Sequence, residues 1–525
     1  MASRRDELSA YTFARKRTVA AFLRPTGGGS VEDAPRAVRA VVPGLVLGAI
    51  AVAAFGAYGM LRPSAPKGWD KANDVIVDKQ TTTRYVMLNG VLHPVLNMSS
   101  ARLLMSAGSG VEYIDDSALN SPSVARGATV GIPYAPDSLP TAADAAKAKT
   151  WAACDRSSAD ATQTVGQRLF VLGGSQASSV SGGRLDDQKA LYVRTSDGTN
   201  YLVDSNGSYH ELDAGKSDPG GALLAKAAFG PSDGTPQVVT TQWLKTLSQG
   251  SPISLPYGLI QGFGAPYTGT DLGGGNSYQV GDLLKVSDNG TTLHYVLLKD
   301  GPHRISDFAR RLVEAMHSSV TETPVNQFKL LDSNTVAPFA ADLNWPQAQV
   351  SQANLNVSNG QMTSCAVYDG QMGQNGPQLG VWLGQDYPVN GAQASGTAGV
   401  YVTPGTGLLL QAVSGAAAGG GKMYLLTDTG LRYPLQMNSD GNSGGGTNGQ
   451  SGGTTGGSDG SGGAASGGAG TAGTTGAASG QQQDTPAARL GYGQVNPLAV
   501  PLSWAQLVPT GPELTKDAAG QQQGS

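Results

Sequence analysis

Histidine is the residue type best suited to proton transfer or metal binding, and three of the five histidines share one sequence context. His93, His210 and His303 each follow the turn glycine of a similar strand–turn–strand segment, and Arg432 stands at that place in a fourth segment. Equivalent positions on separate repeats cannot converge on one metal ion without special symmetry. We therefore predict a structural role for these histidines in their hairpins, and no metal site.

A phosphate-binding loop is the second chemistry to consider, around Gly421-Lys422. Ala416 stands where such a loop has glycine, and Met423 stands where it has a serine or threonine. The hydroxyl that would hold magnesium is therefore missing. We predict no nucleotide or other cofactor site and no catalytic residue here.

Two segments match the Gly-x-Ser-x-Gly pattern of serine hydrolases, at Ser232 and Ser443. Pro236 and the β-prone pair Val238-Val239 follow the first serine, where the hydrolase fold needs a helix. The second match lies in low-complexity sequence and has arisen by chance. The first segment is therefore predicted to be a turn, and neither serine a nucleophile.

Cys154 and Cys365 are the only two cysteines and stand 211 positions apart, in neither a metal-binding nor a redox spacing. In an oxidising compartment two such cysteines most simply pair, and the alternative is two buried free thiols. On the chain-entropy model, closing a loop that long would stabilise the fold by about 5 kcal/mol.

The residues Val41 to Leu61 form 21 consecutive positions without a charge. A helix of this length spans roughly 30 Å, the hydrocarbon thickness of a bilayer. The alternatives are a buried helix of a soluble domain and a signal peptide cleaved near Ala54-Phe55-Gly56. Because forty residues precede the run and signal-peptide cores are shorter, the sequence favours an uncleaved signal anchor.

The tail before this span carries eight cations and the near flank after it four, so the flanking charges do not decide the orientation by themselves. A long C-terminal part crosses the membrane largely regardless of charge, so we expect a cytoplasmic N-terminus and an extracytoplasmic bulk. Residues Ser3 to Leu23 are expected to form a helix with a capping box between Ser3 and Asp6. Its cluster Arg15-Lys16-Arg17 would lie near anionic lipid headgroups, as a solvated basic tail or as a partner-binding helix.

The overall composition implies no general attraction to nucleic acid, since the net charge is −4 and only 14% of residues are charged. Glycine contributes 75 of the 525 residues, and many of them stand in one stretch. Between Asn438 and Gly480 lie 43 residues, of which 18 are Gly. Such a segment cannot bury enough apolar surface to fold, and we predict a flexible insertion.

Self-similar segments occupy the remaining chain. Each opens with Tyr and apolar residues, turns at a glycine that usually follows Asn or Asp, and resumes; they begin at Tyr85, Tyr201, Tyr295 and Tyr424. Asn-Gly and Asp-Gly predict hairpins, because a type I′ turn needs positive φ. A further partial copy begins at Tyr192.

Short helices are expected near these hairpins. They are predicted at Ser99–Leu104, at Asp307–Met316 and around Trp243 and Trp504, which share the order Trp, Leu, Gly, Pro. The stretch Ala143–Trp151 suggests one more helix. The unit is thus predicted to be a hairpin with a helix, repeated about four times, in an α+β fold.

The run from Arg84-Tyr85-Val86 through Leu92-His93-Pro94-Val95-Leu96-Asn97 to Ala101-Arg102-Leu103-Leu104 resembles the EccB family. This family is the membrane-anchored component of the actinobacterial type VII (ESX) secretion system. The basic tail, the single span, Trp151-Ala-Ala-Cys154-Asp155 and Cys365 also fit in order, and only the insertion falls outside the resemblance.

The resemblance implies an elongated region of about four repeats flanking a central domain that a Cys154–Cys365 disulfide closes. It also implies a structural function in the cell membrane, as a homo-oligomer with EccC, EccD, EccE and a MycP-type protease, with membrane lipid as a further partner and no nucleic acid. The expected division is tail 1–40, transmembrane helix 41–61, repeats and central domain 62–437, insertion 438–480, and last repeat with C-terminal tail 481–525.

Two alternatives stay open at this point. Family members are sometimes described as ATPases, although the sequence offers no site for nucleotide and the main domain would lie where ATP is scarce. The chain could also be a membrane-anchored protein that binds the cell wall alone.

Overall fold

The structure is a computed structural model of the 525-residue chain. It describes residues 3–23, 37–61, 65–71, 73–157, 164–215, 218, 221–231, 234–269, 271–273, 275–288, 290–317, 322–325, 337–355, 362–389, 399–415, 421–436 and 484–523. The predicted insertion 438–480 lies outside these residues. The chain divides into two units, residues 1–69 with 113–121, and residues 70–112 with 122–525.

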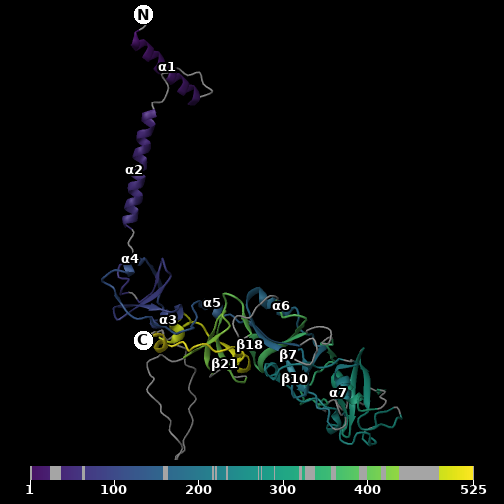
Figure 1. Ribbon diagram of the computed structural model, residues 1–525. Coiled ribbons are helices and arrows are strands. Elements are labelled where there is room, and N and C mark those ends of the chain that lie inside the picture. The colour runs from purple at the N-terminus through teal and green to yellow at the C-terminus, as the bar shows by residue number, and fades with distance from the viewer. Residues whose placement is uncertain are drawn as a thin grey trace, which may run out of the picture. The chain divides into compact units, whose positions relative to one another are not determined.

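The first unit contains two long helices. Helix α1 (Arg4–Leu23) begins with the predicted capping box, in which the Asp6 carboxylate accepts from the Ser3 N–H at 3.2 Å. Helix α2 (Ala37–Leu61) includes the predicted span (Figure 1). Pro43 lies inside this helix. Its window Val41–Tyr58 is the one candidate membrane span among the described residues, and none of that window is buried by the rest of the chain.

The second unit contains four sheets with a common core of three antiparallel strands. In the first sheet these are β1 (Val75–Asp78), β2 (Arg84–Leu88) and β3 (Val91–Val95). The second sheet has β8 (Lys189–Arg194), β9 (Asn200–Asp204) and β10 (Ser208–Glu211). The third has β13 (Leu283–Asp288), β14 (Thr291–Leu298) and β15 (Gly301–Arg304), and the fourth β21 (Leu408–Val413), β22 (Met423–Leu426) and β23 (Arg432–Leu435).

A helix follows the third strand in every sheet, and the chain then returns beside the first strand. The helices are α3 (Met98–Leu104), α7 (Ala222–Phe229), α9 (Asp307–Glu314) and α11 (Pro486–Arg489). The returning strands are β4 (Val111–Ile114), β11 (Gln237–Val238), β16 (Thr323–Pro324) and β24 (Leu498–Pro501). Beside the third strand of the first two sheets lie β5 (Ala125–Arg126) and β12 (Ser248–Gln249).

Each of these four sheets therefore has more strands than the predicted unit, a hairpin with a helix. A first strand and a returning strand are added to it. The segment at Tyr192, predicted to be a further partial copy, forms β8 and its turn, the first strand of the second sheet. The first strands of the other three sheets, β1, β13 and β21, were missed because their sequences lack the tyrosine that marks the second strands.

The predicted hairpins all form, but the type I′ prediction holds only for the first. Asn89 and Gly90 both have positive φ, 50° and 80°. Asn206 and Asp300 do not have positive φ, whereas the glycines that follow them do. In the second hairpin the Asp204 carboxylate accepts from the backbone of Asn206 and Ser208, at 3.0 and 2.9 Å, which stabilises a longer loop.

The fifth sheet has the order β19-β18-β6-β7-β20. Its strands are β6 (Thr150–Ser157), β7 (Thr164–Leu172), β18 (Thr363–Gly373), β19 (Gly376–Gly384) and β20 (Val400–Val402). The helix predicted at Ala143–Trp151 is wrong beyond its first turn. Helix α5 ends at Ala145, and Trp151 is fully buried in β6, because its indole fills the core of this sheet.

Three apolar cores join the sheets to one another. One core combines Leu103 of α3 with Leu425 of the fourth sheet and Leu490, and the C-terminal helix α13 (Lys516–Ala519) also contacts α3 (Figure 1). A second core combines α7 with α9 and so joins the second and third sheets. The largest core joins the fifth sheet, which we call the central sheet, to the second and fourth sheets.

Candidate functional site

The three histidines that the sequence analysis singled out connect each third strand to the chain segment that returns beside it. Nδ1 lies 2.8 Å from the Ala128 carbonyl oxygen for His93, 2.9 Å from that of Ser251 for His210, and 2.9 Å from that of Ala337 for His303. A carbonyl oxygen only accepts, so Nδ1 must carry the proton in each ring. The predicted structural role agrees with this geometry, and we call each contact a clasp.

Glycines beneath two of the rings are part of the clasps, and the sequence analysis missed them. A Cβ on Gly127 would come within 2.2 Å of the His93 ring, and one on Gly250 within 2.3 Å of the His210 ring. A shared sequence motif could have identified these glycines. Both are followed at the same spacing by Ile or Leu, then Pro and Tyr, and the motif ends at Tyr134 and Tyr257. Close approach of backbone and ring excludes a side chain there.

The fourth sheet corrects the prediction that placed Arg432 at the histidine position. Strand register pairs His210 with Leu202 and Tyr433 with Leu425, so Tyr433 is the equivalent residue. A Cβ on Gly511 would lie 2.5 Å from the Tyr433 ring, as in the histidine clasps. Hairpin loops of unequal length misalign the sequences by one residue, and a one-residue shift moves a side chain to the other face of the strand.

Two tryptophan helices dock the second and fourth sheets on the central sheet. Trp243 of α8 (Thr241–Leu244) and Trp504 of α12 (Leu502–Ala505) are both fully buried in one core with Trp151. The Trp504 indole N–H donates to the Thr246 carbonyl oxygen at 2.9 Å. The two helical segments are thus bonded to each other as well as to the sheet.

A buried carboxylate fixes the first of these helices. Asp155 on β6 accepts from the Thr240 N–H at 2.6 Å and from its hydroxyl at 2.8 Å, and Thr240 in turn caps α8 by accepting from the Trp243 N–H. Burial raises the pKa of Asp155, and the two hydrogen bonds from Thr240 oppose that rise. The second helix is held by a neutral group, since the Tyr368 hydroxyl donates to the Ala499 carbonyl oxygen at 2.7 Å.

The two cysteines lie directly opposite each other on the neighbouring strands β6 and β18, with their Cα atoms 4.0 Å apart, and are joined in the structure. Both side chains are fully buried beside Phe170 and Val367. The pair therefore closes the central sheet across two strands that are distant in the sequence.

The other candidate sites have no catalytic geometry in the described part of the chain. Lys422 precedes strand β22 rather than a helix, and its carbonyl oxygen accepts from the Ala412 N–H. Ser232 and Ser443 lie outside the described residues, while Val238 forms the predicted strand. Within the described ranges no three His, Cys, Asp or Glu side chains gather as metal ligands would.

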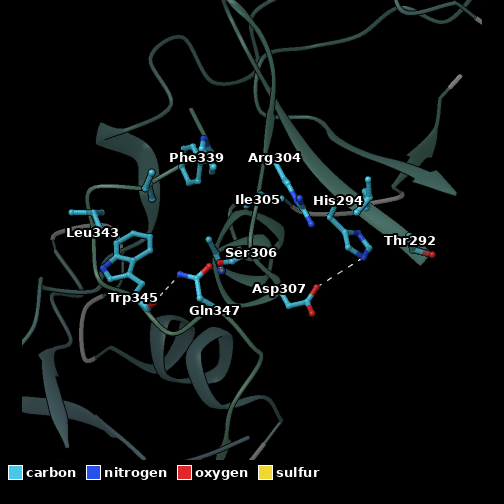
Figure 2. A pocket seen from close by; sticks show the side chains of 15 residues that line it. Thr292, His294, Arg304, Ile305, Ser306, Asp307, Phe339, Leu343, Trp345 and Gln347 are labelled. Carbon is cyan, nitrogen blue, oxygen red and sulfur yellow. Dashed lines mark hydrogen bonds and ion pairs between the residues drawn. The ribbon is translucent and has the colours of Figure 1, made fainter. Parts of the chain in front are cut away.

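One cavity of about 440 Å³ lies on the third sheet, where β14 and β15 meet the start of α9 (Figure 2). His294 and Arg304 line it from the strands, and Asp307 lines it from the helix. The His294 imidazole bonds Glu322 at 2.8 Å through Nδ1, while its Nε2 lies 3.9 Å from the Asp307 carboxylate. Phe339, Leu343 and Trp345 form an apolar wall on the opposite side.

Comparison with known proteins gives a consistent family assignment. The family model of the type VII secretion system ESX-1, transport TM domain B (EccB), matches residues 1–525. The ESX-3 secretion system ATPase EccB3 of Mycobacterium tuberculosis is 26% identical over 473 residues, which cover 84% of this chain and 82% of that protein. The ESX-1 secretion system ATPase EccB1 of Mycolicibacterium smegmatis is 23% identical over 406 residues, which cover 76% and 79%.

Solved structures share the fold. A chain of an intact ESX-5 inner membrane complex matches with a TM-score of 0.59 at 17% identity, covering 100% of this chain and 96% of that one. A chain of the EccB3 dimer from the ESX-3 core complex matches with a TM-score of 0.58 at 21% identity, covering 85% and 100%. Since the family model spans the whole sequence, the chain belongs to the EccB family of type VII secretion system components.

Proposed function

We propose that this chain is a structural core component of a type VII secretion membrane complex, in which it supports pore assembly and docks partners outside the membrane. The whole-chain match to the EccB family carries the proposal. The described geometry is consistent with it, because the clasps, the tryptophan helices and the shared cores pack the sheets against one another. A structural relative is a chain of an ESX-5 inner membrane complex, which supports the same role.

The proposed partners are EccC, EccD, EccE, a MycP-type protease, membrane lipid and further copies of this chain. Dimeric packing in the ESX-3 relative supports self-association. Affinity purification of the tagged full chain from detergent-solubilised membranes is expected to recover EccC and EccD. Recovery of the chain alone, with cell-wall fragments, would instead favour a solitary wall-binding protein.

We further propose that the four sheets are copies of one repeat flanking a central domain. The shared strand order and the rings at equivalent strand positions, those of His93, His210, His303 and Tyr433, support this count. The boundaries at 40, 61, 437 and 480 remain our proposal for the domains. The proposed Cys154–Cys365 disulfide should appear in non-reducing peptide maps of fresh envelopes, and two free thiols there would refute it.

The proposed topology places the N-terminus in the cytoplasm and the sheets outside. A cysteine at Thr18 should resist a membrane-impermeant thiol reagent on intact cells, whereas one at Thr454 should react. The opposite labelling pattern would reverse the orientation.

ATP hydrolysis is the second candidate, because the relatives are named ATPases. Its test is the magnesium-dependent ATPase rate of the purified chain beside a Lys422→Ala variant. We expect both preparations to match a mock purification. A robust rate that Lys422→Ala abolishes would establish an enzyme.

A further inference from the structure

A tyrosine recurs at the same position on the second strand of all four sheets. In each sheet the residue after it pairs with the clasp histidine, or with Tyr433 in the fourth sheet. The four tyrosines are Tyr85, Tyr201, Tyr295 and Tyr424. Because the four rings are equivalent by register, the groups that cover them can be compared.

Three of these rings are covered by groups of the chain itself. The Arg126 guanidinium lies over the Tyr85 ring, 5.5 Å from its centroid. The Arg432 guanidinium lies over the Tyr424 ring, 4.8 Å from its centroid. Tyr295 is instead buried in an apolar cluster, with only 7% of its surface exposed. An arginine is thus the covering group in two sheets, and the negative face of the aromatic ring attracts such a cation.

The second sheet has neutral residues at both positions that supply these arginines. Strand β12 pairs with β10 as β5 pairs with β3, which puts Gln249 at the position of Arg126. The register of β10 against β9, compared with that of β23 against β22, puts Tyr209 at the position of Arg432. The Tyr201 ring therefore has neither of the two covering cations.

A cavity of about 180 Å³ lies beside the Tyr201 ring. Tyr209 lines it as well, and the two rings meet edge to face with their centroids 5.8 Å apart. Both tyrosines are only partly buried. Pockets for drug-sized ligands measure about 300 Å³ or more, so this cavity is suited to the end of a single side chain.

Two opposite charges line the same cavity. Glu211 stands directly opposite Tyr201, at the position that a proline holds in the first and fourth sheets. Lys245 lines the cavity from the segment that follows α8. Both side chains are exposed, and among the described residues neither has an ion-pair partner. Water screens both charges, so the two rings together with the nearby carboxylate favour a cation that enters the cavity.

We propose that this cavity binds the guanidinium of an arginine side chain that a partner protein supplies. The guanidinium takes the position that the chain's own arginines hold in the first and fourth sheets, against the rings of Tyr201 and Tyr209. Its N–H groups donate to the Glu211 carboxylate. Lys245 does not replace it, because an ammonium is a compact, strongly hydrated charge without a planar face to stack on a ring. The inference does not depend on membership of a secretion complex.

The test is a saturation-transfer NMR titration of the full-length chain in neutral detergent with N-acetyl-arginine amide. N-acetyl-citrulline amide, which has nearly the same shape and no charge, is the matched control ligand. The arginine compound should bind saturably at millimolar concentration, and the citrulline compound at least about tenfold more weakly, because the attraction of the rings and of the carboxylate needs the charge. Equal binding of the two compounds, or no saturable binding of the arginine compound, would overturn the proposal.

Variants separate this site from non-specific charge effects. Tyr209→Leu should weaken binding about threefold or more, whereas Tyr209→Phe, which keeps the ring, should bind within about twofold of the parent chain. Glu211→Gln, at an exposed position, should weaken binding by about twofold to fivefold. A Tyr209→Leu chain that is folded by circular dichroism and binds normally would sink the idea.

Lys245 provides the remaining comparison. Lys245→Ala should tighten binding by about twofold to fivefold, because a like charge is removed. Lys226→Ala, which removes an exposed cation of α7 outside the cavity, is the matched control and should bind as the parent chain does. Binding by Lys245→Ala with none by the parent chain would show that the chain's own ammonium fills the cavity, and the proposal would then be wrong.

Discussion

The second and fourth sheets dock on the central sheet through equivalent tryptophan helices, yet the polar groups that hold the helices differ in kind. Trp243 is positioned by a cap that a buried, ionisable carboxylate supports, and within the described residues its own indole N–H has no hydrogen-bond partner. Trp504 has no side-chain cap on its helix but donates through its indole, and a neutral tyrosine holds the strand before it.

We infer from this difference that apolar burial determines where these helices dock, while the polar contacts can be replaced. Both indoles are fully buried in the same core, and burying an indole stabilises the fold by more than any single hydrogen bond. The stability of the Trp243 helix against the fifth sheet should depend on pH, because Asp155 can ionise. The stability of the Trp504 helix should not depend on pH near neutrality, because Tyr368 stays neutral there.

The largest expected effect tests the burial of the two tryptophans, which both helices share. Trp243→Ala and Trp504→Ala should each lower the free energy of unfolding by about 3–5 kcal/mol, because each leaves a large cavity in one core. Trp504→Phe should cost about 1 kcal/mol more than Trp243→Phe, since only Trp504 loses a hydrogen bond. Denaturant unfolding of the purified chain measures both, and equal costs for the two phenylalanine variants would contradict the assignment of that bond.

Removing the polar groups that hold the two helices, Asp155 and Tyr368, should lower the free energy of unfolding by less. The two variants should also differ from each other. Asp155→Ala leaves the buried Thr240 N–H without its acceptor and should cost about 1–3 kcal/mol. Tyr368→Phe removes one neutral hydrogen bond and should cost about 0.5–1.5 kcal/mol. If the tyrosine variant proved the less stable of the two, the polar contacts of the fourth sheet would matter more than we infer.

The pH dependence of stability should distinguish the same two groups. Because the pKa of Asp155 is raised in the folded chain, its folded form binds a proton more tightly than the unfolded form does. Its contribution is therefore most favourable below the unfolded pKa near 3.8 and declines as pH rises from there to the raised folded value. Parent minus Asp155→Asn unfolding free energies should fall over that window, and Tyr368→Phe should leave the profile unchanged below pH 8; a difference that rises with pH would contradict the assignment.

The smallest expected effect concerns the connection from third strand to helix, which runs over residues 212–221 in the second sheet and contains the Gly-rich insertion in the fourth. Deletion of 438–480 should change the free energy of unfolding by less than about 1 kcal/mol, because loop-closure entropy varies slowly with length. Complementation of a deletion strain by this variant should restore secretion. Normal complex abundance with lost secretion would show that the insertion has a function of its own.

Local sequence signals determined much of the fold. Turn glycines and tyrosine openings predicted the second and third strands of all four sheets, and the capping box at Ser3 predicted the start of α1. The run from Val41 predicted the apolar helix α2, because length and lack of charge are properties of the segment alone. The resemblance carried by the segment around His93 predicted the family.

Only the tertiary structure decided which residues share a face or a contact. The flanking strands, some of only two residues, are too short to carry a periodic pattern, and Tyr433 replaces Arg432 because loop length shifts the register. The glycines of the clasps and the Asp155–Thr240 contact join positions far apart in the chain. No local pattern encodes such contacts, because they depend on which distant segments the fold brings together.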